Sequence, residues 1–355
     1  MFNHNRSDIS LYDIIPSRIC NYMPGLVGDF LYGDGYSKHF INLEMYDIIY
    51  ENNAAKSKNS LLEYYLSLIN KKHTKQTFMM CMTLVKYDGT LLRKIIFKNS
   101  VICKAAVGQR CDALRYVPSE LQNEEICMLA VTQDGTALRN VINQTDTICI
   151  AAVTENGTAL YYVINRTEEI LIAAVTQNGL ALEYVTRQTR TETISIAAVT
   201  QNGFALEYVN DKTVEICMTA VTHNGLALEY VNDKTVEICM AAVTQNGLAL
   251  EYVNDKTVEI CMAAVTQNGP ALEYVNDKTV EICMAAVTQN GLALRYVKNQ
   301  TKAICMTAVT QNGLALKYVI DMTEIICIAA VKQDGLALRY VKNQTKAICM
   351  AAVIQ

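Results

Sequence analysis

Hydrophobic and polar positions recur along most of this chain with a fixed period. The segment Ala-Val-Thr-Gln-Asn-Gly-Leu-Ala-Leu-Glu-Tyr-Val returns with small changes from about residue 77 to residue 355. Neighbouring copies lie about 22 residues apart, or about 24 at two steps, and a period in this range is typical of stacked repeat arrays. Each unit of such an array buries its apolar face against the next. Cys111 replaces the glycine of the second copy, and the other copies carry Gly89, Gly135, Gly157, Gly179, Gly203, Gly225, Gly247, Gly269, Gly291, Gly313 and Gly335.

The first half of each repeat has the pattern of a short α-helix. Thr257 precedes the apolar run Ile260–Val265, and Thr is a favoured N-cap because its oxygen accepts a free backbone N–H of the first turn. Glu259 in that turn suits the positive end of the helix dipole. We expect Gly269 to end the helix in a left-handed conformation. The pattern predicts a first helix of about ten residues in each repeat.

The second half of each repeat predicts another, shorter helix. Leu248 and Tyr252 are four residues apart and share a helical face. Pro270 suits the first turn of such a helix, where its missing N–H does no harm. A helix of only about seven or eight residues needs tertiary packing, which the neighbouring repeats supply. Together the two halves predict an all-α fold, an α-solenoid of about twelve stacked short helical hairpins with an N-terminal cap.

A leucine-rich horseshoe is the alternative fold, because Leu-Ala-Leu also fits a strand with a period of two. That motif requires Asn where Val253 stands, and Asn254 comes one residue late. The paired Ala263 and Ala264 favour a helix over a strand. The helical interpretation is therefore preferred.

Residues 1–76 lack the repeat and form a region separate from the array at 77–355. Residues 61–69 and 11–23 are predicted as amphipathic helices, the second restricted by Pro16. We expect this region to cap the open apolar end of the stack. An adaptor module of the F-box kind is a second interpretation, prompted by the segment at residues 11–16.

Composition limits the location and the partners. A net charge of −4 disfavours a general phosphate-binding surface. Apolar runs within repeats are too short to span a bilayer, and residues 1–30 lack the pattern of a signal peptide. We expect a cytoplasmic protein that is not secreted and does not interact with membranes.

The thirteen cysteines invite a metal or disulfide interpretation. Equivalent positions of stacked helices lie about 8–10 Å apart, which is too far for a disulfide or a shared zinc ion. Buried, reduced thiols are therefore expected. Eleven of the cysteines occupy one repeat position: Cys81, Cys103, Cys127, Cys149, Cys217, Cys239, Cys261, Cys283, Cys305, Cys327 and Cys349.

A tyrosine recurs five residues after the glycine, and we expect its ring to pack between repeats rather than to stack on nucleic-acid bases. The four histidines are scattered, and His223 merely replaces a repeat glutamine. The sequence contains no nucleophile–histidine–acid set and no phosphate loop. We therefore predict no enzyme, and assign no catalytic residue, no cofactor-binding residue, no cofactor and no metal ligand. The tyrosines are Tyr116, Tyr162, Tyr184, Tyr208, Tyr230, Tyr252, Tyr274, Tyr296, Tyr318 and Tyr340.

Charge changes sign along the array. Residues 203–290 carry four Lys and twelve Asp or Glu, a net −8, whereas residues 291–355 carry eight basic and three acidic residues, a net +5. Stacking turns this series into an acidic stripe beside a basic one, which is either drift on a solvated face or a bipolar docking surface for a partner or a second copy. The position four residues after the glycine place reads Arg93, Arg115, Arg139, then Glu183, Glu207, Glu229, Glu251, Glu273, then Arg295, Lys317 and Arg339.

The motif Ala-Val-x-x-Asn-Gly-x-Ala-Leu-x-Tyr, preceded by Ile-Cys-Met-Ala, resembles a short helical-hairpin repeat family of unknown function that is abundant in giant amoeba viruses. The resemblance covers residues 77–355 and implies a viral protein, in the host cytoplasm, without assigning any site residue. The first repeat departs most from it, at residues 90–94.

We expect a non-enzymatic scaffold for protein–protein interaction with an unidentified protein partner. The alternative is a nucleic-acid-binding array that uses the basic C-terminal third, although nucleic acid is the less favoured partner. End-to-end self-association is a further expectation, because Ile348, Val353 and Ile354 have no following repeat to cover them.

Overall fold

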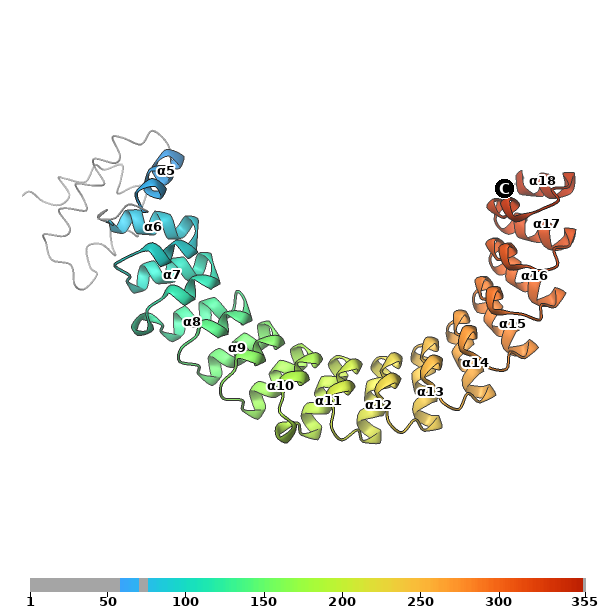
Figure 1. The fold of residues 1–355 in the computed structure, drawn as a ribbon, viewed down its shortest axis with the longest axis horizontal. Coiled ribbons are helices and arrows are strands. Elements are labelled where there is room, and N and C mark those ends of the chain that lie inside the picture. Colours follow the sequence, from blue (N-terminus) through green and yellow to red (C-terminus); the bar gives the residue numbers. More distant parts are fainter. Residues whose placement is uncertain (1–57, 70–75, 354–355) are drawn as a thin grey trace, which may run out of the picture. The chain divides into compact units, whose positions relative to one another are not determined.

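The computed structural model describes residues 58–69 and 76–353, which are coloured in Figure 1. The chain divides into two compact units, Met1–Gln109 and Arg110–Gln355. The helix expected at residues 11–23 and the adaptor-like segment at 11–16 lie outside the described residues, as do most residues of the expected cap.

The described residues of the first unit form one helix from before the repeats, the first repeat and the α-helix of the second. Helix α5 packs on the first repeat through a buried cluster of Tyr65, Ile69, Met80, Leu84 and Leu91, so the helix expected at 61–69 is confirmed. The departing sequence at 90–94 still forms the second element of a hairpin. The elements are α5 (Lys58–Leu68), α6 (Phe78–Tyr87), η1 (Gly89–Lys94, a 3₁₀-helix) and α7 (Ser100–Gln109).

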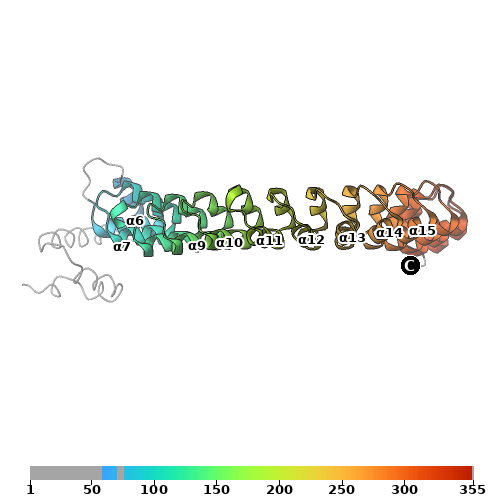
Figure 2. The same cartoon turned by 90° about the horizontal axis from the view of Figure 1, so that it is seen from below.

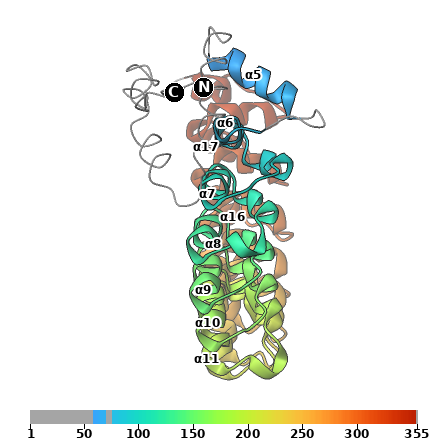
Figure 3. The same ribbon diagram turned by 90° about the vertical axis from the view of Figure 1, so that its left-hand side faces the viewer.

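The second unit repeats one hairpin, an α-helix followed by a 3₁₀-helix. The α-helices contact their neighbours in one layer and the 3₁₀-helices theirs in a second layer beside it (Figures 2 and 3). The elements are η2 (Cys111–Tyr116), η3 (Ser119–Leu121), α8 (Glu124–Val131), η4 (Gly135–Asn140), α9 (Asp146–Glu155), η5 (Gly157–Tyr162), α10 (Glu168–Gln177), η6 (Gly179–Tyr184), η7 (Arg187–Thr189), α11 (Glu192–Gln201), η8 (Gly203–Tyr208), α12 (Val214–His223), η9 (Gly225–Tyr230), α13 (Val236–Gln245), η10 (Gly247–Tyr252), α14 (Val258–Gln267), η11 (Gly269–Tyr274), α15 (Val280–Gln289), η12 (Gly291–Tyr296), α16 (Lys302–Gln311), η13 (Gly313–Tyr318), α17 (Glu324–Gln333), η14 (Gly335–Tyr340) and α18 (Lys346–Val353).

The all-α solenoid is thereby confirmed. The described residues contain no strand, so the horseshoe alternative is wrong. Within the same residues, twelve hairpins run from α6–η1 to α17–η14, followed by α18. The short 3₁₀ turns η3 and η7 fall within the two longer repeat steps, where they take up the extra length.

The N-caps follow the sequence prediction. Thr257 has an extended backbone, and its hydroxyl accepts the N–H of Ile260 at 3.4 Å. Helix α14 then runs for ten residues to Gln267, with Ile260 and Cys261 among its buried side chains. A threonine caps the α-helix in the same way from α9 to α17.

The second element differs from the expected helix of seven or eight residues. It is a 3₁₀-helix of six residues, such as Gly247–Tyr252, with three residues per turn. Gly247, Leu250 and the following Val253 therefore share one edge, which is buried. Leu248 and Glu251 share another edge, which faces solvent. The spacing of three suits this pattern better than the spacing of four on which the prediction rested.

The expected left-handed glycine is also wrong. Asn246 ends the α-helix in an extended conformation and its side chain accepts the N–H of Leu248 at 3.1 Å. Gly247 is required for space: a Cβ there would lie 2.3 Å from the carbonyl oxygen of Ala264 in the next repeat. Glycine thus allows the next α-helix to approach the backbone closely.

Two hydrogen-bonded links join successive hairpins, and neither was expected from the sequence. In the first, Gln267 accepts the N–H of Gly247 at 2.6 Å and donates to the carbonyl of Gln245 at 3.3 Å. In the second, a long side chain in the loop before the α-helix donates to the carbonyl of the next tyrosine. Lys212 Nζ contacts the Tyr230 oxygen at 2.8 Å in this way.

The end of the described stack needs one correction. Ile348 was expected to lack cover, yet it is only 2% exposed because α18 packs on α17 and η14. Val353 is 82% exposed, and Ile354 lies outside the described residues. End-to-end association therefore stays a prediction that Ile348 does not support.

We predict that Gly247→Ala destabilises the stack by at least about 2 kcal/mol, because the new methyl overlaps a backbone oxygen of the next repeat. Thermal unfolding, with hydrogen exchange over residues 247–268, measures the effect. Gly335→Ala is the matched control, since its Cβ would lie 3.0 Å from the Ala352 carbonyl oxygen, which a movement of a few tenths of an ångström relieves. Equal losses in the two variants would contradict the close-approach argument.

We also predict that His223→Gln stabilises the stack by about 1 kcal/mol. His223 Nδ1 lies 2.9 Å from the Thr219 carbonyl instead of joining Gly203, so this junction lacks the glutamine link. Chemical unfolding measures the gain. The reverse control is Gln245→His, which removes the 2.7 Å link from Gly225 and should cost a similar amount. The prediction requires that His223→Gln raises the free energy of unfolding and that Gln245→His lowers it.

Candidate binding surface

The solvent-facing edge of the 3₁₀ layer, which we call the outer edge, consists of the residues one and four positions after each repeat glycine. A period of three places these two residues on the same side of the 3₁₀-helix. The first is mostly leucine, partly exposed, as Leu180 is at 39%. The second is exposed throughout the second unit: Arg115, Arg139, Tyr161, Glu183, Glu207, Glu229, Glu251, Glu273, Arg295, Lys317 and Arg339.

Glutamates and tyrosines of successive repeats are coupled along the acidic part of this edge. Glu229, one repeat earlier, contributes to the raised pKa of Tyr252, and Glu251 contributes likewise to that of Tyr274. Partial burial and the neighbouring glutamate charges raise the pKa of Tyr252. The glutamates themselves remain exposed at the surface.

Cations replace the glutamates in the last three 3₁₀-helices, and each lies over the tyrosine that follows it. The guanidinium carbon of Arg295 is 4.3 Å from the ring centre of Tyr296. Arg339 lies 4.8 Å from Tyr340, and Lys317 lies 5.5 Å from Tyr318. These cation–π contacts orient the basic side chains without neutralising them.

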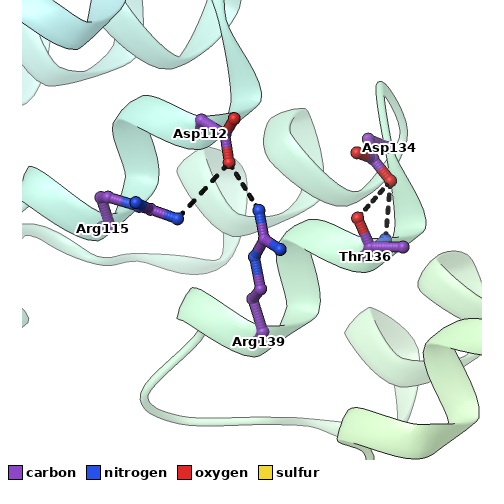
Figure 4. Close-up of polar contacts among 5 residues, drawn as sticks. All are labelled: Asp112, Arg115, Asp134, Thr136 and Arg139. Carbon is purple, nitrogen blue, oxygen red and sulfur yellow. Dashed lines mark hydrogen bonds and ion pairs between the residues drawn. The ribbon is translucent and has the colours of Figure 1, made fainter.

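The basic residues at the start of the second unit are different, because two of them share an ion pair with one aspartate. Asp112 lies 2.8 Å from Arg139 and 3.8 Å from Arg115 (Figure 4). The hydrogen bond to Asp112 raises the pKa of Arg139. In the following repeat, Asp134 accepts hydrogen bonds from the hydroxyl and the N–H of Thr136, at 2.7 and 2.9 Å. The strongest available positive charge therefore lies at residues 295–339.

The tyrosine rings are half-buried beside the outer edge, as expected for packing between repeats. Tyr161 contacts Tyr184 edge to face at 5.6 Å, and Phe204 contacts Tyr230 in the same way at 6.3 Å. Edge-to-face packing does not present open ring faces on which bases stack.

The repeat cysteines lie in the interior. Ten of the twelve described cysteines are buried and all twelve are free thiols, while Cys111 and Cys349 are half-buried. Cys261 Sγ lies 3.7 Å from the carbonyl of Lys256, as a weak donor. Burial raises the pKa of the buried thiols, in Cys103 to about 11. No group of three metal-ligating side chains occurs in the described residues.

The second unit has a hollow at α12 and α13 and another near α18. The larger, of about 820 Å³, is an open, mainly apolar depression between α12 and α13, lined by Met218, Val236 and Met240. The smaller, of about 450 Å³, adjoins Val341 and Ile348 near α18. The smaller hollow also has Glu324, Cys327 and Lys342 in its lining, and the Thr345 hydroxyl donates to Glu324 at 2.7 Å. None of the helices in the described ranges is long and apolar enough to cross a membrane.

The repeats are similar to a known family. Six overlapping segments match the model described as Domain of unknown function (DUF4116): residues 102–144, 191–235, 213–257, 235–279, 257–302 and 280–324. Each match spans about two hairpins, which supports a repeat family of unknown function. No curated protein and no solved structure matches the chain.

We predict that the buried thiols of Cys261 and Cys283 resist alkylation near pH 8, because burial raises their pKa and leaves little thiolate. Half-buried Cys349 should react first, as measured by mass spectrometry of the labelled folded chain. Labelling in denaturant is the control and should make the three equivalent. Fast labelling of Cys261 in the folded chain would contradict the burial.

We also predict that raising the pH from 9 toward 11 lowers the free energy of unfolding through Cys103, because the thiol of the unfolded chain ionises at a lower pH than the buried thiol.

Proposed function

We propose that this chain is a non-enzymatic scaffold for protein–protein interaction that binds its partner along the outer edge. The observation that carries the proposal is the change of sign of exposed residues at one repeat position, from Glu183–Glu273 to Arg295–Arg339. The stack does not need these charges for its core, because the buried edge consists of Gly, Leu and Val. A rigid series of exposed charges with apolar neighbours suits a protein partner.

A scaffold explains the distribution of chemistry better than an enzyme does. Interior positions of the array carry aliphatic side chains and protonated thiols, and the one histidine in the described residues, His223, is exposed beside a backbone carbonyl. Catalysis requires an acid, base or nucleophile held in mutual contact. The repeats place their titratable groups on the outside, one pitch apart.

We propose a cytoplasmic location, because a ladder of buried free thiols suits a reducing compartment. If the chain is viral, as the resemblance of its repeats implies, this is the host cytoplasm.

Nucleic-acid binding is the second candidate, and the Arg–Tyr contacts at 295–296 and 339–340 favour it. Arginine and aromatic side chains together are common in single-strand binding surfaces. The acidic repeats beside them oppose a long nucleic-acid track. Protein therefore remains the favoured partner.

We predict that a photo-cross-linking residue at Leu314, on the outer edge, forms adducts with a partner protein in the cells that make this chain. The control is the same residue at Met262, on the α-helical layer, which should give none. The triple variant R295E/K317E/R339E should lose the Leu314 adducts while keeping its circular dichroism, because exposed substitutions barely affect stability.

Adducts to RNA at Leu314, with binding that weakens steeply with salt, would support the second candidate instead. Protein adducts confined to Met262 would contradict the outer edge as the docking surface.

A further inference from the structure

The charge of the outer edge changes from negative to positive at a single point, midway between η11 and η12. Glu229, Glu251 and Glu273 lie on one side of this point, and Arg295, Lys317 and Arg339 lie on the other. Neighbouring members of this set are separated by the same length of chain throughout, including the step across the midpoint. Because the intervening hairpins have the same elements, the six charges are evenly spaced along one edge.

We infer that the outer edge binds a second copy of this chain, antiparallel, about a two-fold axis at that midpoint. This rests on the proposed function and names its partner. The axis sets Glu273 against Arg295 of the second copy, Glu251 against Lys317, and Glu229 against Arg339. A two-fold axis repeats each pair, so every one of the six charges meets an opposite charge.

The other member of the outer edge completes the match with apolar contacts. Residues one position after each glycine lie beside the charges, and the same axis sets Pro270 against Leu292, Leu248 against Leu314, and Leu226 against Leu336. All six are apolar, and Leu336 is 66% exposed. Each charge pair therefore has an apolar pair next to it, which is the composition of a specific interface.

The inversion is regular only on the outer edge. In the first turn of the α-helices, Glu237, Glu259 and Glu281 are equally exposed and equally spaced. Their equivalents in the later repeats are Ala303, Ile325 and Ala347, so this position carries no positive charge there. The α-helical layer gains cations one residue earlier, at Lys302 and Lys346, but Glu324 holds the same position in the repeat between them. Of these positions, only the outer edge carries a cation in each of η12, η13 and η14.

Other alignments are less favourable. A parallel pair about a two-fold axis sets each residue against its own copy, which places glutamate against glutamate. Moving the antiparallel axis onto η11 sets Glu273 against its own copy, and moving it onto η12 does the same for Arg295. The midpoint axis is the register, among these, that opposes no like charges, and like-charge contacts are what exclude wrong registers.

Sedimentation of the full chain and its variants tests the inference. The wild-type chain should dimerise in low salt and dissociate between roughly 0.05 and 0.5 M salt, as screening shortens the reach of exposed charges. The acidic variant R295E/K317E/R339E and the basic variant E229K/E251K/E273K should each be monomeric. An equimolar mixture of the two should form a heterodimer, because their edges are now uniformly opposite.

The sixfold variant that carries both sets of substitutions should regain the homodimer, since it restores every pair with exchanged signs. E237K/E259K/E281K is the matched control: it makes the same charge change on the α-helical layer and should still dimerise. Circular dichroism verifies that each variant is folded.

A wild-type chain that is monomeric at high micromolar concentration in low salt would overturn the inference. So would a dimer that survives both triple reversals, because its interface lies elsewhere, or a mixture that stays monomeric. The proposed function fails separately: it fails when Leu314 cross-links no protein in cells, and it stands when Leu314 captures a different protein while the purified chain is monomeric.

Discussion

The close approach of each α-helix to the glycine of the preceding repeat is the contact on which the rest of the stack depends. The carbonyl of Ala264 occupies the space where a side chain of Gly247 would lie. That approach brings Gln267 within reach of the Gly247 N–H, and so places the hydrogen-bonded link between hairpins. Because the same contact recurs from Gly135 to Gly313, successive hairpins are set at nearly the same spacing. Even spacing of the outer edge is a consequence of this packing.

Local signals in the sequence predict the first half of the repeat well and the second half only in part. Thr257 is a favoured cap by its own chemistry, and the paired alanines of the run that follows favour a helix. In so short a segment, Leu248 and Tyr252 fit a spacing of four as readily as Leu250 and Val253 fit a spacing of three. Gly247 looks like a left-handed stop when seen alone, since its real constraint comes from a carbonyl in the next repeat. Contacts between repeats carry information that no single repeat contains.

The candidate surface was visible in the sequence as a charge series, because the repeat period itself aligns equivalent positions along the chain. The second link between hairpins was not visible. Its donors are Gln144, Lys212 and Gln300, which differ in charge and occupy a loop position that resembles an ordinary turn. What they share is length and a donor, and only the position of the next tyrosine carbonyl shows why that matters. Ile348 was misjudged for a similar reason, since its cover comes from the preceding hairpin.

A stack held together in this way has little freedom to build chemistry inside. Each interior position faces its own equivalent in the neighbouring repeats, so a buried charge would be repeated or would clash with the packing around it. Variation is tolerated on the edges: the repeat position that is Glu251 in η10 is Lys317 in η13, and no core residue is disturbed. Single exposed ion pairs contribute little, but evenly spaced pairs on a stiff edge form together or not at all. Specificity in such a protein therefore resides in the order of signs along the array, which a change at one repeat position is enough to rewrite.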